Sequence, residues 1–233
     1  MSLRHYEEAL PELREACRLH PTLADAFFRL GQVYRALNDP ASAATALKRA
    51  EMLDPRDPEA SYLAGQSLKD LGKTDAAIAA WERTLAKDPQ NQQALYSLMR
   101  ALRKDHPGEA TLLAERLRSL ELRKLALERA KTLNNLALTK KQEGNWAAAV
   151  SGLREAIQTC GDCDLESALH KNLGLVQCQA GDYEAGEREL RLALNAMPHD
   201  PEIHRAPGIL GTIRARSSSE TRLNLAKRDS SAK

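Results

Sequence analysis

Aromatic residues, long apolar runs and strand patterns are all scarce in this chain, and each scarcity excludes a class of protein. Only 4% of the 233 residues are aromatic. No apolar run reaches the roughly 18 residues of a transmembrane helix, and the first residues lack the apolar segment of a signal peptide. No β-branched run alternates with polar residues, so we expect no sheet. Alanine and leucine abound instead, and both favour helix.

Strong charge and catalytic motifs are missing as well. The net charge of +2 is far from the basic balance of a typical nucleic-acid binder, so no nucleic-acid partner is expected. The sequence has no glycine-rich phosphate loop, no pair of histidines on one helix face and no nucleophile elbow. We therefore predict no enzyme activity and no cofactor. We expect no membrane partner and, if this N-terminus is the native one, a cytoplasmic protein.

What the chain does contain is a step of 34 residues. Four sets of residues follow it: Pro21, Pro55 and Pro89; Ala9, Ala43 and Ala77; Leu13, Leu47 and Trp81; Phe28, Tyr62 and Tyr96. A fixed period in this range predicts one supersecondary unit repeated along a solenoid, whose core forms where units stack. Such a protein acts through recognition surfaces, so the step directs the functional question away from catalysis.

One repeat shows the pattern in full. Residues 24–37 place apolar side chains at helical spacing, and Asn38, Asp39 and Pro40 then break the helix. Residues 41–53 form a second helix, which Pro55 ends because proline cannot continue a helix. Gly31 costs the first helix about 1 kcal/mol relative to alanine, so we expect it to allow close packing of the second helix.

These residues resemble the tetratricopeptide repeat. The first full repeat matches that family's pattern with Phe27, Leu30, Gly31, Tyr34, Ala43, Leu47, Ala50 and Pro55. The second matches with Gly65, Leu68, Ala77, Trp81 and Pro89, and the third begins with Leu95, Leu98, Met99 and Leu102. Two more are centred on Ala137, Trp146 and Leu153, and on Gly174, Tyr183 and Leu190. The resemblance implies an all-α, right-handed α-solenoid of stacked antiparallel helix pairs, with about five repeats and a partial one at the start.

The spacing also predicts the domain organisation. We expect a partial repeat (second helix only) over 1–23, three repeats over 24–129, two repeats over 130–200, a degenerate capping helix over 201–216 and a disordered tail over 217–233. Residues 109–143 contain neither glycine nor proline, so one long helix is expected to join the two blocks of repeats. A tight turn near Ser119 is the alternative. The mid-repeat start also leaves open that an upstream repeat is missing.

In this family the first helices line a concave groove, so the resemblance implies where a partner would bind. Its groove-facing positions hold nine basic residues, Arg29, Arg35, Lys69, Arg100, Arg103, Lys104, Lys131, Lys141 and Lys171, against three acidic ones, Asp25, Glu59 and Asp70. A groove of one sign favours partners of the other. Phe28, Tyr62 and Tyr96 would form an aromatic ladder there, although packing between neighbouring repeats explains these rings equally well. Asn134, Asn135 and Asn172 could pair with a peptide backbone.

Two of the four cysteines, Cys160 and Cys163, lie in an insertion between the fourth and fifth repeats. They could be plain thiols, a disulfide in an oxidising compartment, or part of a metal site with His170. A structural zinc site normally needs a second cysteine pair, which this chain lacks.

The function predicted from the sequence is therefore a non-enzymatic protein-interaction scaffold that binds an acidic peptide in its groove. The alternatives are an RNA-binding helical-repeat protein, a metal or redox module at the paired cysteines, and an accessory repeat segment of a larger enzyme. The unpaired first helix and the degenerate last repeat leave apolar faces through which copies of the chain could associate.

Overall fold

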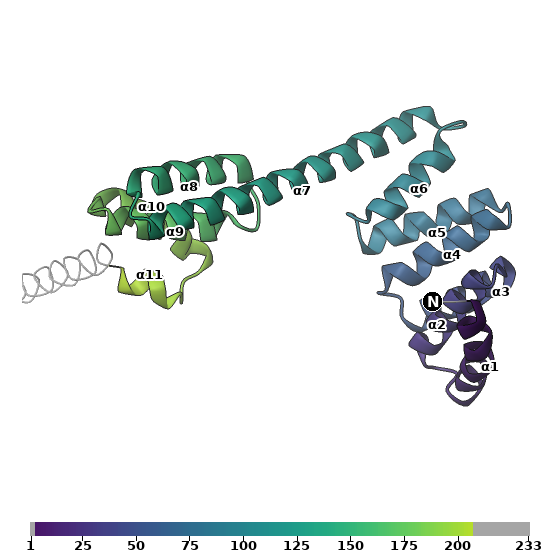
Figure 1. The fold of residues 1–233 in the computed structure, drawn as a ribbon. Coiled ribbons are helices and arrows are strands. Elements are labelled where there is room, and N and C mark those ends of the chain that lie inside the picture. Colours follow the sequence, from purple (N-terminus) through teal and green to yellow (C-terminus); the bar gives the residue numbers. More distant parts are fainter. Residues whose placement is uncertain (1–2, 207–233) are drawn as a thin grey trace, which may run out of the picture. The chain divides into compact units, whose positions relative to one another are not determined.

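The computed structural model describes residues 3–206, and within this range the chain forms eleven helices and no strand. The helices are α1 Leu3–Leu19, α2 Ala24–Ala36, α3 Pro40–Leu53, α4 Pro58–Asp70, α5 Thr74–Lys87, α6 Gln92–Leu102, α7 Pro107–Gln142, α8 Trp146–Cys160, α9 Glu166–Gln179, α10 Tyr183–Ala196 and α11 Pro201–Arg205 (Figure 1). Of the predicted capping helix over 201–216, only the part up to Ala206 is described, and the predicted disordered tail lies outside the described residues. Between residues 3 and 206 no helix combines the length and apolarity needed to cross a membrane.

The chain divides into two compact units, Met1–Leu120 and Glu121–Lys233. The division falls inside α7, which is a single helix of 36 residues. The helix continues through Ser119, so the turn considered as an alternative does not form. The assignment of particular residues to numbered repeats stays a prediction.

Unit 1 is built from helix pairs. Within it, α2 packs against α3 and α4 against α5, while α3 contacts α4 and α5 contacts α6 (Figure 1). Aspartate side chains cap the helices locally: Asp39 accepts a hydrogen bond from the Ser42 backbone, and Asp57 from the Glu59 backbone. A proline follows each cap at the start of the helix, where its fixed φ favours helix and no hydrogen bond is lost. Local sequence therefore sets where these helices begin.

The contact inside each pair joins a small residue to a large one sixteen positions later. A Cβ added to Gly31 would lie 2.5 Å from Cγ of Leu47, and one added to Gly65 would lie 2.5 Å from Nε1 of Trp81. Both Leu47 and Trp81 are fully buried. The absent side chains of these glycines thus make room for the second helix, as the sequence predicted for Gly31.

Unit 2 repeats this construction. A Cβ added to Gly174 of α9 would lie 2.6 Å from Cγ of Leu190 in α10. The C-terminal part of α7 contributes Ala130 and Ala137 to a core shared with α8 and α9, in which Leu153 and Leu173 are buried. A second cluster joins α9 and α10 to α11 through residues that include Cys178, Leu190 and Ile203. Each unit therefore holds a core of its own.

Candidate functional site

Of the groove-facing residues predicted in unit 1, Arg29, Arg35 and Glu59 line a hollow of about 520 Å³, and the others do not. It is lined from α2 by Arg29, Gln32, Val33 and Arg35, from α4 by Glu59 and Leu63, and from α1 by His5, Tyr6, Ala9 and Leu13. Two arginines thus lie beside an apolar surface, with one glutamate among them. The sequence predicted α1 as a helix without a partner but did not predict that its side chains line this hollow. The 34-residue period predicts where a helix lies in the sequence, and it does not predict which other helices contact it.

The two arginines of this hollow differ in their pairing. Arg29 donates to Asp25 at 2.7 Å across one turn of α2, and that bond raises the pKa of the guanidinium. Both side chains of the pair are more than half exposed, at 62% and 60%, so the pair contributes little to stability. Arg35 makes no ion pair with another described residue.

The three aromatic residues at the groove position are not equivalent. Phe28 and Tyr62 are half-buried and pack against core clusters of unit 1. The hydroxyl of Tyr62 accepts a hydrogen bond of 2.9 Å from Gln66 Nε2, which also donates to Ser97 Oγ at 2.8 Å. Tyr96 is 51% exposed. In the structure the first two rings pack between helices, and only Tyr96 presents a large surface to solvent.

The end of α6 gathers further predicted groove residues. The guanidinium of Arg100 lies 5.8 Å from the centre of the Tyr96 ring. Arg103 is exposed and follows the last residue of α6. Cations are favoured at a helix C-terminus because they offset the partial negative charge of its free carbonyls.

In unit 2 the asparagines predicted for the groove bind one another. Asn172 Nδ2 donates to Asn134 Oδ1 at 2.8 Å, which links α9 to α7. Asn134 in turn lies 3.5 Å from Asn135 Oδ1. Lys131 is paired with Glu128 at 2.9 Å on its own helix. The amides that the sequence assigned to a peptide backbone therefore hold two helices together.

Lys171 also has partners within unit 2. Its Nζ contacts Asp200 at 3.0 Å and Glu202 at 2.8 Å, at the start of α11. The hydrogen bond to Glu202 raises the pKa of Lys171 against the opposing effect of burial, and the bond to Asp200 adds to it. The pKa of Asp200 is lowered because, although burial opposes it, Lys171 and two backbone N–H groups stabilise the carboxylate. The positive charge of Lys171 is thus balanced by the two carboxylates at the start of α11.

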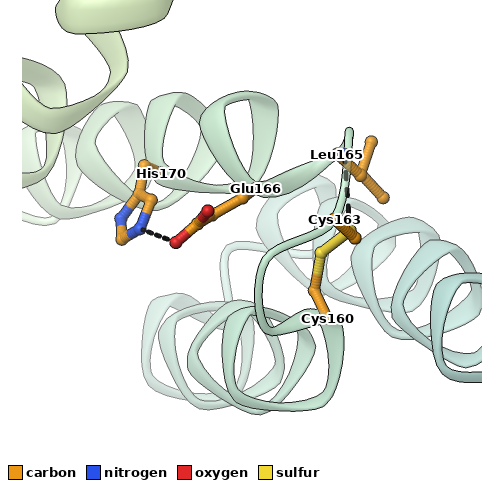
Figure 2. The surroundings of a disulfide bond; sticks show 5 residues. All are labelled: Cys160, Cys163, Leu165, Glu166 and His170. Carbon is orange, nitrogen blue, oxygen red and sulfur yellow. Dashed lines mark hydrogen bonds and ion pairs between the residues drawn. A yellow bond between two sulfur atoms is a disulfide. The ribbon is translucent and has the colours of Figure 1, made fainter. Parts of the chain in front are cut away.

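The paired cysteines form a disulfide between the end of α8 and the following loop. Their Cα atoms are 5.5 Å apart, and the Leu165 backbone N–H points at Cys163 Sγ, 3.4 Å away. Figure 2 shows the His170 ring turned toward Glu166 rather than toward the sulfurs. Its Nδ1 lies 2.6 Å from Glu189. No cluster of metal-ligating side chains occurs within residues 3–206, and His170 does not complete a site with the cysteines.

One polar residue escaped the sequence analysis. Gln177 of α9 is 2% exposed, and its side-chain Oε1 has no hydrogen-bond partner. It stands three residues after Gly174, where the first two repeats have Tyr34 after Gly31 and Leu68 after Gly65. A polar residue at a position otherwise apolar was the signal that could have revealed it.

Comparisons with known proteins agree with this architecture. A family model described as anaphase-promoting complex, cyclosome, subunit 3 matches residues 2–84, and a tetratricopeptide-repeat model matches residues 62–121. Together the two models span residues 2–121, which is slightly more than half of the chain. No curated protein sequence matches at a significant level.

Several solved structures match this chain at low identity. YrrB, described as a TPR protein with an unusual peptide-binding site, is 18% identical, with a TM-score of 0.43 over 83% of this chain and 96% of that one. PilW, a type IV pilus biogenesis factor, is 16% identical, with a TM-score of 0.44 over 86% and 90%. A thermophilic TPR protein from Thermus thermophilus is 19% identical, with a TM-score of 0.38 over 80% and 98%.

The assignment of this chain to a family rests on two observations that agree. The two family models together cover residues 2–121, and helix pairs with the same contact between a small residue and a large one recur in both units. Proteins of this kind are generally non-enzymatic and bind other proteins or peptides through their helical repeats. This chain belongs to the tetratricopeptide-repeat family.

Proposed function

We propose that this protein is a non-enzymatic scaffold that binds an acidic segment of a partner protein in the groove of unit 1. The observation that carries the proposal is the hollow between α1, α2 and α4, where Arg29 and Arg35 flank an apolar surface. Such a surface suits a peptide that alternates acidic and apolar side chains. The carboxylates would pair with the arginines while the apolar side chains cover Val33 and Leu63.

The charges around the hollow would also fix the peptide's direction. Arginine holds carboxylates through paired hydrogen bonds of defined geometry, and Glu59 repels an acidic side chain placed beside it. An acidic residue is therefore accommodated at the α2 side of the hollow and disfavoured at the α4 side. Tyr96, Arg100 and Arg103 extend the proposed surface along α6, which is the first helix of the third predicted repeat.

The proposal is tested by measuring the binding of a labelled peptide by fluorescence polarisation. The probe is a glycine-serine-flanked peptide of alternating glutamate and leucine, and the variant is Arg29→Glu with Arg35→Glu. A matched control, Lys48→Glu with Arg56→Glu, changes the net charge equally at exposed positions that do not line the hollow. Each lost charged hydrogen bond removes about 1.5–3 kcal/mol, so the groove variant should bind at least ten-fold more weakly.

The outcomes separate the proposal from its rivals. The control should bind within about two-fold of the wild type, because charges outside the hollow act only through a screened long-range field. Equal weakening of both variants would show that net charge rather than the groove holds the peptide. Preferential retention of single-stranded RNA, lost steeply with added salt, would favour the RNA-binding alternative.

A further inference from the structure

A second hollow, of about 440 Å³, lies wholly within unit 2 and away from the groove-facing positions. Trp146, Val150, Ser151 and Arg154 line it from the first half of α8. Gln177, near the end of α9, and Asp182, which caps α10, line it from the other side. The site therefore combines an aromatic surface, a cation and a buried amide.

Gln177 is the feature that points to a ligand. Its side chain is almost fully buried, yet Oε1 accepts no hydrogen bond, and Nε2 donates none to any other described residue. Buried amides are almost always paired, because an unpaired one loses its bonds to water without replacement. At the equivalent position Leu68 has no polar group, and the Tyr34 hydroxyl accepts a hydrogen bond from Arg14 at 2.8 Å. The terminal torsion of glutamine is soft, so this amide can offer either its oxygen or its nitrogen to an incoming group.

The other residues of the hollow are also available for binding. Arg154 is exposed and pairs with no carboxylate among the described residues. Trp146 is 37% exposed and lines the hollow with Val150. Asp182 uses one oxygen to accept from the Ala185 backbone at 3.1 Å, as the cap of α10. A ligand here meets one unpaired cation and one apolar surface, with the amide between them.

We propose that this hollow binds a short peptide segment in which a large apolar side chain stands next to a carboxylate. The apolar side chain packs on Trp146, the carboxylate binds Arg154, and a backbone peptide group of the ligand pairs with the Gln177 amide. A peptide group fits that amide because each carries one donor and one acceptor face. The proposal does not depend on the groove of unit 1, since the two hollows share no residue.

The test uses the chain's two tryptophans as separate reporters. Trp146 lines the hollow, whereas Trp81 is fully buried in unit 1. In a two-dimensional nitrogen–proton spectrum each gives one indole signal, and Trp146→Phe identifies which is which. The probe is a blocked tetrapeptide Ser-Phe-Glu-Ser, with Phe→Ala and Glu→Gln versions as controls. The probe should move the Trp146 signal saturably and leave the Trp81 signal in place.

Two variants decide the roles of the side chains. Arg154→Gln should weaken the probe about ten-fold or more while leaving the Glu→Gln peptide unaffected, and Arg123→Gln, an exposed arginine outside the hollow, should change nothing. Gln177→Leu should weaken the probe and raise the melting temperature, because it removes the unpaired amide. A stationary Trp146 signal at millimolar probe would overturn the proposal. So would equal binding by all variants, or a Gln177→Leu protein that is less stable yet binds as well as the wild type.

Discussion

Replacing Gly65 by alanine should destabilise unit 1, although alanine is the better helix former. The added Cβ would lie 2.5 Å from Nε1 and 2.7 Å from Cδ1 of Trp81, whereas atoms in contact prefer about 3.5–4.0 Å. Trp81 is fully buried and packs among Ala77, Ala94 and Leu98, so its ring cannot move aside freely. Overpacking of this kind costs about 1–3 kcal/mol. The gain in helix propensity offsets about 1 kcal/mol, which leaves a net loss of up to about 2 kcal/mol.

Gly108→Ala supplies the matched control. Gly108 also lies in a helix, but an added Cβ meets nothing within 4 Å, so this variant should be neutral or more stable by up to about 1 kcal/mol. Urea unfolding followed by Trp81 fluorescence, in a Trp146→Phe background, reports on unit 1. The two variants should differ by about 1–3 kcal/mol in unfolding free energy. A Gly65→Ala protein as stable as the Gly108→Ala protein would refute the close-packing argument.

Two further predictions concern an acidic group and the disulfide. The pKa of Glu51 is lowered because, although burial would raise it, hydrogen bonds from Arg83 and Lys87 outweigh that effect. The stability that Glu51 contributes is thus present above its unfolded-state pKa of about 4.3 and lost as pH falls through the folded-state pKa. In this acidic range the unfolding free energy of unit 1, measured with urea, should depend less on pH in Glu51→Gln than in the wild type. An equal pH dependence in both proteins would contradict this. The Cys160–Cys163 bond closes a loop of about four residues, so its reduction should lower the unfolding free energy of unit 2 by about 2 kcal/mol. Thermal unfolding with and without reductant measures this loss. A variant with serine at both positions should unfold at the same temperature with and without reductant.

The helices of the first full repeat could be predicted almost to the residue. The spacing predicted helices over 24–37 and 41–53, and the structure has Ala24–Ala36 and Pro40–Leu53. This worked because the signals are local: apolar residues at helical spacing, a break at Asn38, Asp39 and Pro40, and an end at Pro55. The long helix followed from a similar local observation, the absence of glycine and proline, and α7 extends through the whole of that segment except its last residue.

The groove could be predicted less well, because a position in the repeat does not reveal what surrounds a side chain. Lys171 was assigned to partner binding, but it pairs with Asp200 and Glu202, 29 and 31 residues away. Tyr62 was assigned to an aromatic ladder, but it is half-buried and hydrogen-bonded. The Lys171 contacts depend on a helix whose distance along the chain carries no sequence signal, and the repeat position of Tyr62 does not reveal its bond to Gln66 or its burial.

The sequence by itself determined that this is a solenoid of helix pairs, because the period, the caps and the small-to-large pairs such as Gly31 with Leu47 are set by backbone geometry and steric volume. Only the tertiary structure decided which polar groups remain available. Arg35 and Arg154 lack an acid among the described residues, Lys171 has two, and the amide of Gln177 is buried without a bond. Hydrogen bonding and ion pairing act over a few ångströms in space, so they become visible only when distant segments are brought together.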